Sequence, residues 1–375
     1  MKIIAFYLPQ FHEIPENNEW WGKGFTEWVN VKKATPLFKG HNQPRVPLNN
    51  NYYNLLNSET LKWQDGLAQK YGVYGFCFYH YWFDGHKLLE KPVEMYLHDD
   101  SLQTHYCICW ANEHWTNAWS GGEAKVLIEQ RYGSEKEWSD HFDYLLPFFK
   151  DRRYILHNNK PLLIIYRPEL IGCLNEMLDY LNKKAVDAGF NGIEFAYQHA
   201  GYTVSSKCDE SHFTYAIEYH PNCAQVFMSV ERGGFFEQAK KGVITYIENN
   251  LKINLREILK AKKLRHYDYD YLWEYINKMK PRNSKCVPGA FVDWDNTPRR
   301  GIRGFVVDGA TPEKFEKYLT KQIIKARNEY NKDMLFVFSW NEWAEGGYLE
   351  PDEHNGFGYL EAVKKSLEKT GELEE

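Results

Sequence analysis

The chain has 375 residues, and its 51 acidic residues outnumber its 46 basic ones for a net charge of -5 at pH 7. Without a basic surplus, the chain has no extended surface to neutralise the phosphates of a nucleic acid. No apolar run approaches the roughly 20 residues that a helix needs to span a membrane. We therefore expect no nucleic-acid partner and no membrane-spanning segment.

Eight strands are predicted along the chain, and they alternate with helical stretches. The strands cover residues 2–7, 73–79, 105–110, 161–166, 193–197, 213–219, 287–292 and 335–339. The helices cover residues 58–71, 88–97, 134–150, 170–188, 311–330 and 357–369. Two segments do not fit the alternation. Residues 13–57 lack clear periodicity but are rich in tryptophan and phenylalanine, so we expect them to fold over one end of the domain.

The second irregular segment, residues 223–283, is lysine-rich and is predicted to be a helical insertion without strands of its own. The alternation elsewhere implies parallel pairing with right-handed crossovers. Eight such units predict one domain over residues 1–375, a (β/α)8 or TIM barrel whose length beyond the typical ~250 residues lies in the two irregular segments. A doubly wound open sheet is the alternative, but no G-x-G-x-x-G and no P-loop follows any strand.

Aromatic residues make up 17% of the chain, with 13 tryptophans, 27 tyrosines and 22 phenylalanines. Tryptophan and tyrosine often line sugar pockets, because their flat apolar rings stack on the C–H faces of pyranoses while their polar tips bond hydroxyls. The composition therefore favours carbohydrate recognition. An aromatic-rich core is the alternative explanation.

The cysteines indicate the redox environment of the chain. There are seven, with Cys77, Cys107 and Cys109 inside predicted strands and no C-x-x-C pair. We expect reduced thiols, no zinc site and a cytoplasmic location. The first nine residues have a short apolar run and no small-residue cleavage site, so they are predicted to form a strand rather than a signal peptide.

The most informative stretch begins in the last predicted strand and ends in a pair of glutamates. Residues 335–339 form the continuous apolar run of a buried parallel strand, and Glu342 and Glu345 follow it. In an extended strand these two positions face opposite sides. Both can enter one pocket only if the chain turns at about Asn341, and the glycine pair at 346–347 would permit that turn.

Two carboxyl groups facing one cavity disfavour each other's ionisation, so that one can act as an acid and the other as a base, as in glycosidases. The alternative is a helix N-terminus that Asn341 caps, with both glutamates in its first turns, where the helix dipole favours them. All eight strands end in residues suited to polar recognition, and a barrel gathers these ends on one face. This agreement favours the acid–base pair.

Strand-end position makes further residues candidates for contact with a sugar. The residues that we expect to stack on sugar rings are Tyr79, Trp110 and Trp340. The residues that we expect to bond hydroxyl groups are His80, Asn112, Glu113, Arg167, Gln198 and Asp293. A structural role is the alternative for each, because polar groups at a barrel rim also need partners.

Five motifs resemble the WbsX-like proteins of bacterial polysaccharide gene clusters, which look like relatives of glycoside hydrolase family 99, the endo-α-mannosidases. The motifs are Tyr7-Leu-Pro-Gln-Phe-His12, Gly24-Phe-Thr-Glu-Trp28, Trp110-Ala-Asn-Glu113, Trp294-Asp-Asn-Thr-Pro298 and Trp340-Asn-Glu-Trp-Ala-Glu-Gly346. They occur in the same order and span nearly the whole chain. Tyr7, Trp28 and Asn341 lie within them and complete the expected substrate-binding set.

The resemblance implies a retaining hydrolase on a (β/α)8 barrel that needs no metal and no cofactor, with Glu342 as the base and Glu345 as the acid. In that family the base is thought to deprotonate the 2-hydroxyl of the sugar, which attacks the anomeric carbon and forms a 1,2-anhydro sugar that water then opens. Glu345 must reach the glycosidic oxygen, so its pKa should be raised. The expected substrate is a bacterial surface polysaccharide or its precursor, with α-mannosides as the class that the resemblance suggests.

Two other functions compete with hydrolysis. The older family label is "glycosyltransferase", and Asp293-Trp-Asp295 is formally a D-x-D motif that could hold a metal with the diphosphate of a nucleotide sugar. A nucleotide-sugar-dependent transferase of O-antigen or capsule synthesis is therefore the alternative, although no nucleotide-binding α/β half accompanies the motif. A non-catalytic sugar-binding barrel is the third hypothesis, and the paired carboxylates argue against it because binding needs neither acid nor base.

Overall fold

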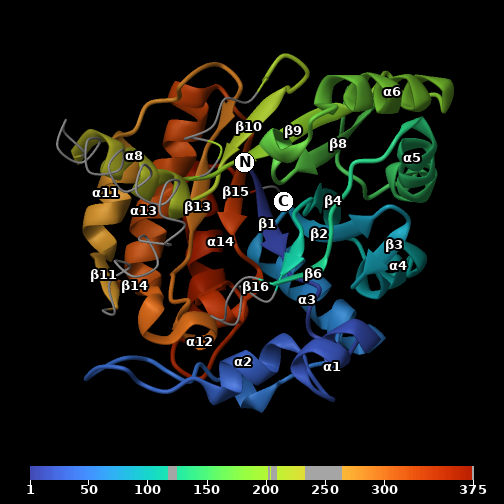
Figure 1. Cartoon of the computed structure of the whole chain (residues 1–375). Coiled ribbons are helices and arrows are strands. Elements are labelled where there is room, and N and C mark those ends of the chain that lie inside the picture. The colour runs from blue at the N-terminus through green and yellow to red at the C-terminus, as the bar shows by residue number, and fades with distance from the viewer. Residues whose placement is uncertain (117–124, 202, 204–208, 233–263, 374–375) are drawn as a thin grey trace, which may run out of the picture.

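The barrel strands run parallel and follow one another around the centre of the molecule (Figure 1). The computed structural model describes residues 1–116, 125–201, 203, 209–232 and 264–373. In order around the barrel, the strands are β1 (Lys2–Tyr7), β2 (Gly75–Phe83), β4 (His105–Trp110), β8 (Lys160–Ile165), β9 (Glu194–His199), β10 (Tyr215–Glu218), β12 (Cys286–Val287) with β13 (Gly289–Phe291), and β15 (Met334–Phe338).

The barrel closes through the segment from β12 to β13. β12 pairs with β10, β13 pairs with β15, and Pro288 separates the two short strands. Proline has no N–H to offer a sheet, but its carbonyl oxygen accepts a hydrogen bond from Phe336 N at 3.3 Å. Because β15 also pairs with β1, from Lys2↔Met334 to Ala5↔Val337, the circle is complete. The predicted (β/α)8 barrel is confirmed.

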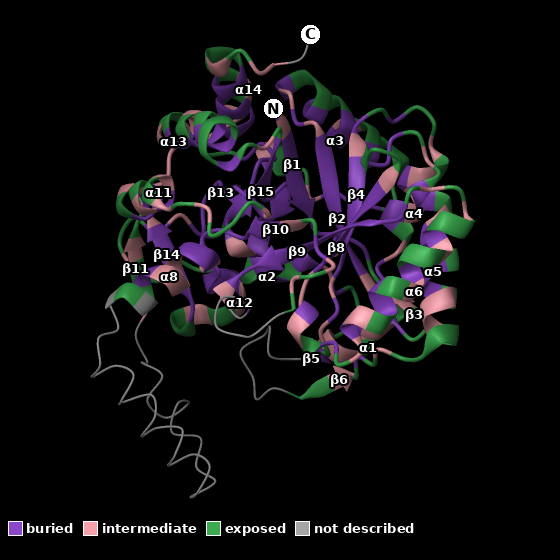
Figure 2. Cartoon of the chain, turned by 90° about the horizontal axis from the view of Figure 1, so that it is seen from above, coloured by how far each residue is buried: buried purple, intermediate pink, exposed green. Residues whose placement is uncertain are grey.

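Helices surround the strands and bury their apolar sides against them. Figure 2 shows buried strands at the centre and exposed helix faces at the periphery. These helices are α3 (Ser58–Tyr71), α4 (Lys91–His98), α5 (Glu135–Phe149), α6 (Leu174–Asp187), α8 (Asn222–Arg232), α11 (Tyr269–Lys278), α13 (Pro312–Lys325) and α14 (Gly358–Thr370). Side-chain caps fix several of their starts, as where Thr311 accepts from Lys314 N at the start of α13.

The segment between β1 and α3 lies over the carboxyl ends of the strands, as the sequence predicts. It contains the helices α1 (Pro15–Trp21) and α2 (Glu27–Lys33) and the short 3-10 helix η1 (Leu48–Asn50), none of which is predicted from the sequence. Both α-helices have seven residues, which is about two turns and too short for a periodic apolar pattern to stand out.

The predicted helical insertion at 223–283 requires a correction. Residues 233–263 of it lie outside the described residues, and α8 and α11 confirm helices near its two ends. However, Arg265–Asp268 forms the strand β11, which pairs in parallel with β14 (Phe305–Asp308). The four residues of β11 are polar and largely exposed, so only backbone pairing with a distant segment reveals the strand. Helix α11 buries Trp273 completely and packs against α13 as an ordinary barrel helix.

Most predicted strands match the observed ones within two residues. The exception is β2, which runs on to Phe83 and forms a hairpin with β3 (His86–Leu88) where a helix start was expected. Cys77, Cys107 and Cys109 are buried as free thiols in the barrel strands, as predicted. Across the part of the chain that the structure describes, no helix combines the length and apolar character needed to cross a membrane.

Candidate active site

A cavity of about 540 Å³ lies at the carboxyl end of the barrel, where the strand ends meet helix α2. Its aromatic wall consists of Trp21, Phe25, Tyr79, Tyr81, Trp115, Tyr166, Tyr219, Trp294 and Phe305. Its polar side chains are Gln10, Glu27, Asn30, Lys33, Glu113, His114, Arg167, Asn222, Asn296, Arg299, Arg300, Glu342 and Glu345. The cavity therefore combines flat apolar faces with hydrogen-bonding groups, as a sugar site requires.

A tight turn brings both glutamates into this cavity. After β15, the chain forms the short strand β16 (Asn341–Glu342), one turn of 3-10 helix η6 (Trp343–Glu345) and the strand β17 (Gly347–Tyr348), which pairs back with β16. The side chain of Asn341 accepts from Leu8 N at 2.8 Å and donates to Leu8 O at 3.0 Å. The chain thus leaves the strand at Asn341, as predicted, and this residue ties the turn to the end of β1.

The two glycines that follow Glu345 are required by this turn. Gly346 has a φ of +71°, and a Cβ there would lie 2.8 Å from Asp295 N. A Cβ at Gly347 would overlap the Phe338 ring. The single helical turn also excludes the capping alternative, because no longer helix follows and Asn341 bonds to Leu8 instead of to a helix N-terminus.

One guanidinium group connects three carboxylates in the cavity wall. Arg299, on the short helix α12 (Thr297–Arg300), directs each of its nitrogens at a different glutamate. Arg299 Nε lies 2.9 Å from Glu27 Oε1, Nη2 lies 3.0 Å from Glu342 Oε2, and Nη1 lies 2.9 Å from Glu345 Oε1. The exposed fraction of these four side chains is between 3% and 12%. The carboxylates are therefore close together and largely shielded from water.

The environment favours protonation of the carboxyl pair. Burial raises the pKa of Glu342 to about 8, and repulsion from Glu345 and Glu27 adds to this while the Arg299 guanidinium opposes it. Burial also raises the pKa of Glu345, again against the attraction of Arg299, which is the direction expected for an acid. One guanidinium cannot neutralise three carboxylates, so the cluster retains a proton near neutral pH.

Three of the expected substrate-binding residues line the cavity. Tyr79 belongs to the aromatic wall, and Glu113 and Arg167 belong to the polar wall. The Arg167 guanidinium forms ion pairs with both Glu113 and Glu169. The strand ends that carry these residues are therefore correctly identified by the sequence.

Three other expected residues lie behind the wall and support it. Gln198 is buried and its Nε2 donates to the Tyr79 hydroxyl at 3.1 Å. Asn112 Oδ1 accepts from Arg167 N at 2.7 Å, and Asn112 Nδ2 donates to Arg167 O at 2.8 Å. Asn341 holds Leu8, which lines the cavity, as described above. None of these three residues is part of the cavity lining, and their polar groups are engaged by the protein.

Five expected residues are part of the buried packing instead. The Tyr7 hydroxyl donates to Gln64 Oε1 at 2.7 Å, Trp28 Nε1 donates to Tyr53 O at 2.8 Å, and Trp340 is completely buried. His80 Nε2 lies 3.0 Å from His141 Nε2, and burial lowers the pKa of His80 to about 3.

Trp110 Nε1 donates to Trp82 O at 3.3 Å, so this indole also turns away from the cavity. None of these five residues is part of the cavity lining, and each packs within the protein. The aromatic-rich core, offered as the alternative to a sugar site, accounts for part of the tryptophan content.

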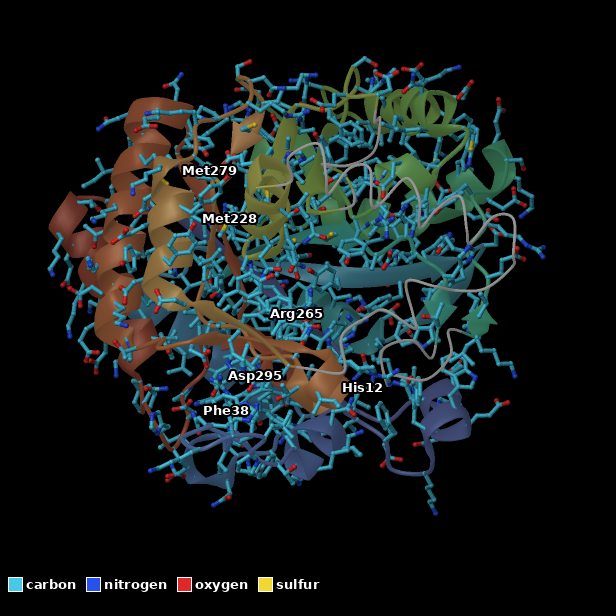
Figure 3. All side chains as sticks on the ribbon, turned by 60° about the vertical axis from the view of Figure 1, so that its left-hand side comes forward. His12, Phe38, Met228, Arg265, Met279 and Asp295 are labelled. Carbon is cyan, nitrogen blue, oxygen red and sulfur yellow. The ribbon has the colours of Figure 1, made fainter. Side chains whose placement is uncertain are left out.

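The D-x-D motif is sealed inside the protein. Asp293 Oδ2 accepts from Arg45 Nη2 at 2.7 Å. Asp295 accepts from His41 Nε2, Gln43 Nε2 and both the N–H and the hydroxyl of Thr297, at 2.6 to 3.0 Å. Burial would raise the pKa of Asp295, but these hydrogen bonds and the positive charge of Arg45 outweigh it and lower this pKa to about 2. His41, which bonds Asp295, stacks on Phe38 of the segment that covers the barrel, and Figure 3 labels both Asp295 and Phe38.

These contacts bear on two predictions. Asp293, which was expected to bond a sugar hydroxyl, is not part of the cavity lining, and its carboxylate accepts from Arg45 and from Trp294 N. The two aspartates also cannot act together as ligands of a metal–diphosphate complex, since their oxygens already accept hydrogen bonds from buried donors.

Four charged residues of the cavity wall were not expected from the sequence: Glu27, Lys33, Arg299 and Arg300. Glu27 lies inside the Gly24–Trp28 motif, and Arg299 directly follows the Trp294–Pro298 motif. The motifs were therefore a usable signal, but neither residue stands at a strand end that suggests a direction for its side chain. Tyr81, Tyr166, Tyr219 and Trp294 were also not singled out, although each lies at or just beyond the end of a barrel strand.

The fold is a (β/α)8 barrel that is similar to two solved structures. It is similar to the GH99 endo-alpha-mannosidase from Bacteroides thetaiotaomicron, with a TM-score of 0.55 over 98% of this chain and 97% of that chain at 14% identity. It is also similar to a structure described as a glycoside hydrolase-like protein, with a TM-score of 0.57 over 97% and 93% of the two chains at 13% identity. At these identities the similarity concerns the fold.

The sequence defines the family. The family described as Glycosyltransferase WbsX matches residues 3–363, and the chain belongs to this family. Similar relatives are the uncharacterized proteins WxcX of Xanthomonas campestris pv. campestris strains B100 and ATCC 33913, which are 32% and 33% identical over 373 residues. These matches cover 99% of this chain but 50% of each relative, so the chain spans about half the length of these proteins.

Proposed function

We propose that this chain is a retaining glycoside hydrolase that acts on a bacterial surface polysaccharide or its precursor. The observation that carries the proposal is the convergence of Glu342 and Glu345 on one aromatic-lined cavity. Binding alone would not require two buried carboxyl groups that share a proton. Acid–base cleavage of a glycosidic bond requires such a pair.

In the proposed first step, the Glu342 carboxylate takes the proton of the sugar 2-hydroxyl. The hydroxyl oxygen attacks the anomeric carbon, the bond to the leaving oxygen breaks, and Glu345 donates its proton to that oxygen. In the second step, water attacks the anomeric carbon and gives a proton to Glu345, while the opening 1,2-anhydro ring recovers its proton from Glu342. Two displacements at one carbon give net retention, and both glutamates return to their starting states.

The cavity suits this chemistry in two further ways. Its aromatic wall offers faces on which pyranose rings can stack, at a contribution of about 0.5–1.5 kcal/mol for each ring beyond the buried area. The raised pKa values of Glu342 and Glu345 keep one proton available to the pair near neutral pH. The first step starts from the state in which Glu345 holds this proton and Glu342 is the carboxylate. Because a similar fold is that of an endo-alpha-mannosidase, we propose α-linked mannosides as the first substrate class to test.

A nucleotide-sugar-dependent glycosyltransferase is the second candidate, and the family description favours it. The buried hydrogen bonds of Asp293 and Asp295 weigh against it, because they leave the D-x-D carboxylates without room for a metal–diphosphate complex. Binding of a nucleoside diphosphate with manganese, measured by calorimetry, tests this candidate directly.

The test of hydrolysis is a product screen on purified bacterial polysaccharides and α-mannan oligosaccharides. Wild type is compared with Glu342→Gln and Glu345→Gln, which keep the size and hydrogen-bonding groups of the side chains. We expect new reducing ends from wild type only, with retention of anomeric configuration seen by NMR before mutarotation. Equal product from wild type and both variants would exclude the proposed acid and base. Product that appears only when a nucleotide sugar is added would support transfer instead.

A further inference from the structure

The Arg299 guanidinium forms ion pairs with three glutamates, and one of them, Glu27, comes from a different part of the chain than the other two. Glu342 and Glu345 follow β15, whereas Glu27 belongs to helix α2 of the segment that covers the barrel. Arg299 Nε pairs with Glu27 at 2.9 Å, which leaves the two terminal nitrogens for Glu342 and Glu345. Since a guanidinium is planar, fixing Nε sets the directions of the other two nitrogens.

Glu27 is itself firmly held. Its N–H donates to Gln10 O at 2.9 Å, and its Oε1 also accepts from Asn30 Nδ2 at 3.1 Å. The next residue, Trp28, contacts Trp343 with a ring-centroid distance of 5.4 Å, and Trp343 lies between the two glutamates. Helix α2 is therefore packed against the same turn that carries Glu342 and Glu345.

We propose that Glu27 and Arg299 act together as positioning residues, in which Glu27 orients the guanidinium and the guanidinium holds the Glu342 and Glu345 carboxyls facing the same substrate. This inference rests on the proposed function of that pair. It assigns helix α2 to the active centre, so the segment that covers the barrel completes the site rather than only enclosing it. Neither Glu27 nor Arg299 exchanges a proton in this assignment.

The two positioning residues carry opposite charges, and this gives the proposal a distinctive consequence. The negative charge of Glu27 raises the pKa of Glu342 and of Glu345, while the positive charge of Arg299 lowers both, against a background of burial that raises them. Removing the charge of Glu27 should therefore lower both pKa values, and removing that of Arg299 should raise them. A purely structural role predicts no such opposite shifts.

Other ionisable groups also face Glu342 and Glu345. The ionisable groups around Glu342 and Glu345 are Tyr79 and Tyr81 on β2, Tyr219 after β10, and Arg300 on α12. Burial keeps the pKa of each of these three phenols above its ordinary value. The phenols thus stay neutral across the range in which the glutamates titrate. Arg300 lowers the pKa of Glu345 and is unchanged in every variant, so Glu27 and Arg299 are the charges that differ between variants.

The experiment measures protonation without any substrate. Only protonated carboxyls react with a water-soluble carbodiimide, so the whole chain is labelled with carbodiimide and glycine ethyl ester between pH 5 and 9. Peptide mass spectrometry then gives the labelling of Glu342 relative to exposed carboxyls in the same sample. The variants are Glu27→Gln, Arg299→Gln and Arg299→Lys, and the matched control is Glu113→Gln, which removes a carboxylate from another part of the cavity wall.

We expect the Glu342 midpoint to fall by about one pH unit in Glu27→Gln and to rise by about one unit in Arg299→Gln. Glu113→Gln should leave it unchanged, and Arg299→Lys should keep it near the wild-type value because the charge remains. Shifts in the same direction, or no shift in Glu27→Gln, would overturn the proposal. If Arg299→Gln fails to fold by circular dichroism, Glu27→Gln and Arg299→Lys still decide the result.

Activity measurements separate this inference from the proposed function. On a glycan that the wild type cleaves, Arg299→Lys should lower kcat at least tenfold even at its own optimal pH, because an ammonium cannot direct two nitrogens at two carboxylates. An unchanged kcat in Arg299→Lys would overturn positioning while leaving the hydrolase intact. Opposite labelling shifts in a chain without hydrolase activity would retain the charge coupling and reject the proposed reaction.

Discussion

Two acidic motifs follow neighbouring strands of the barrel, and the pKa values of their carboxyl groups shift in opposite directions. Asp293-Trp-Asp295 follows β13, and Glu342-Trp-Ala-Glu345 follows β15, with which β13 is paired. Each motif contains a tryptophan and contacts one buried arginine. Yet the pKa of Asp295 is lowered to about 2, whereas that of Glu342 is raised to about 8.

The difference lies in the number of hydrogen-bond donors around each carboxylate. Four donors from three residues surround the Asp295 carboxylate, so its charge is stable in the interior. The Glu342 carboxylate shares one guanidinium with two other carboxylates and otherwise faces a cavity. A fully satisfied buried carboxylate holds structure together, while a poorly neutralised one beside a cavity is ready to exchange a proton. Acidic residues alone do not distinguish the two cases.

The largest expected effect separates the motifs by activity. In Glu345→Gln we expect kcat on a cleaved glycan to fall by about 10²–10⁴-fold, because the leaving oxygen loses its proton donor. The thermal midpoint should stay within a few degrees of wild type. A fall of less than tenfold would remove Glu345 from the reaction and with it the contrast between the two motifs.

The next effect separates the motifs by stability. Asp295→Ala leaves four buried donors without an acceptor, and we expect the free energy of unfolding to fall by about 3–5 kcal/mol. Urea denaturation measures the loss. The control is Asp308→Ala, whose carboxylate pairs with His266 at the surface and which should cost about 0–1 kcal/mol. Equal losses in the two variants would contradict a structural role specific to Asp295.

A third variant acts on the contact between the two motifs. Asp295 N donates to Glu345 O at 2.7 Å, and a Cβ at Gly346 would lie 2.8 Å from the same Asp295 N. We expect Gly346→Ala to lower the free energy of unfolding by about 1–3 kcal/mol, through this overlap and the strain of its positive φ. Gly66→Ala in α3 is the control, because a Cβ there meets nothing within 4 Å. This variant should raise the free energy of unfolding by about 0.5–1 kcal/mol. If Gly346→Ala left the free energy of unfolding unchanged, the loops that carry the two motifs would be free to move apart.

The last expected effect, similar in size to that of Gly346→Ala, is the pH dependence of stability in Glu342→Gln. The pKa of Glu342 rises from 4.5 to about 8 on folding, so the stability that its protonation supplies is complete below pH 4.5 and is lost as the pH rises through 8. Glutamine does not titrate, so the free energy of unfolding of the variant should rise relative to that of wild type between pH 4.5 and 8, by about 1–3 kcal/mol at pH 8. Urea denaturation at pH 5 to 8 measures this gain. A difference that stays flat with pH would show that Glu342 is ionised throughout.

The sequence predicted the barrel well because its signals are local. The apolar runs of β1, β4 and β15 each record burial on both faces of a strand, and their alternation with amphipathic helices implies parallel pairing. The polar exposed strand β11 carries no such signal, since its backbone pairs with β14 across a long stretch of chain. The short helices α1 and α2 were not predicted for a related reason: a helix of two turns is too short to show a periodic apolar pattern.

The lining of the cavity was predicted in part. Strand-end position was enough to find Glu342, Glu345 and Tyr79, because a barrel brings all strand ends to one face. It could not tell that Trp110 and His80 point away from the cavity, or that Asn112 and Gln198 support it from behind. Those outcomes depend on which neighbours occupy the space around each side chain, and these neighbours come from distant segments.

By itself, then, the order of residues determined that eight buried strands would form and that two glutamates would leave the last of them on a turn. Only the folded chain decided which acidic groups face the cavity and which are sealed, because that choice depends on donors supplied by other elements. His41 and Gln43 reach Asp295 from the segment that covers the barrel, and Glu27 reaches Arg299 from the same segment. Charge state is thus set by packing between parts of the chain that no local pattern connects.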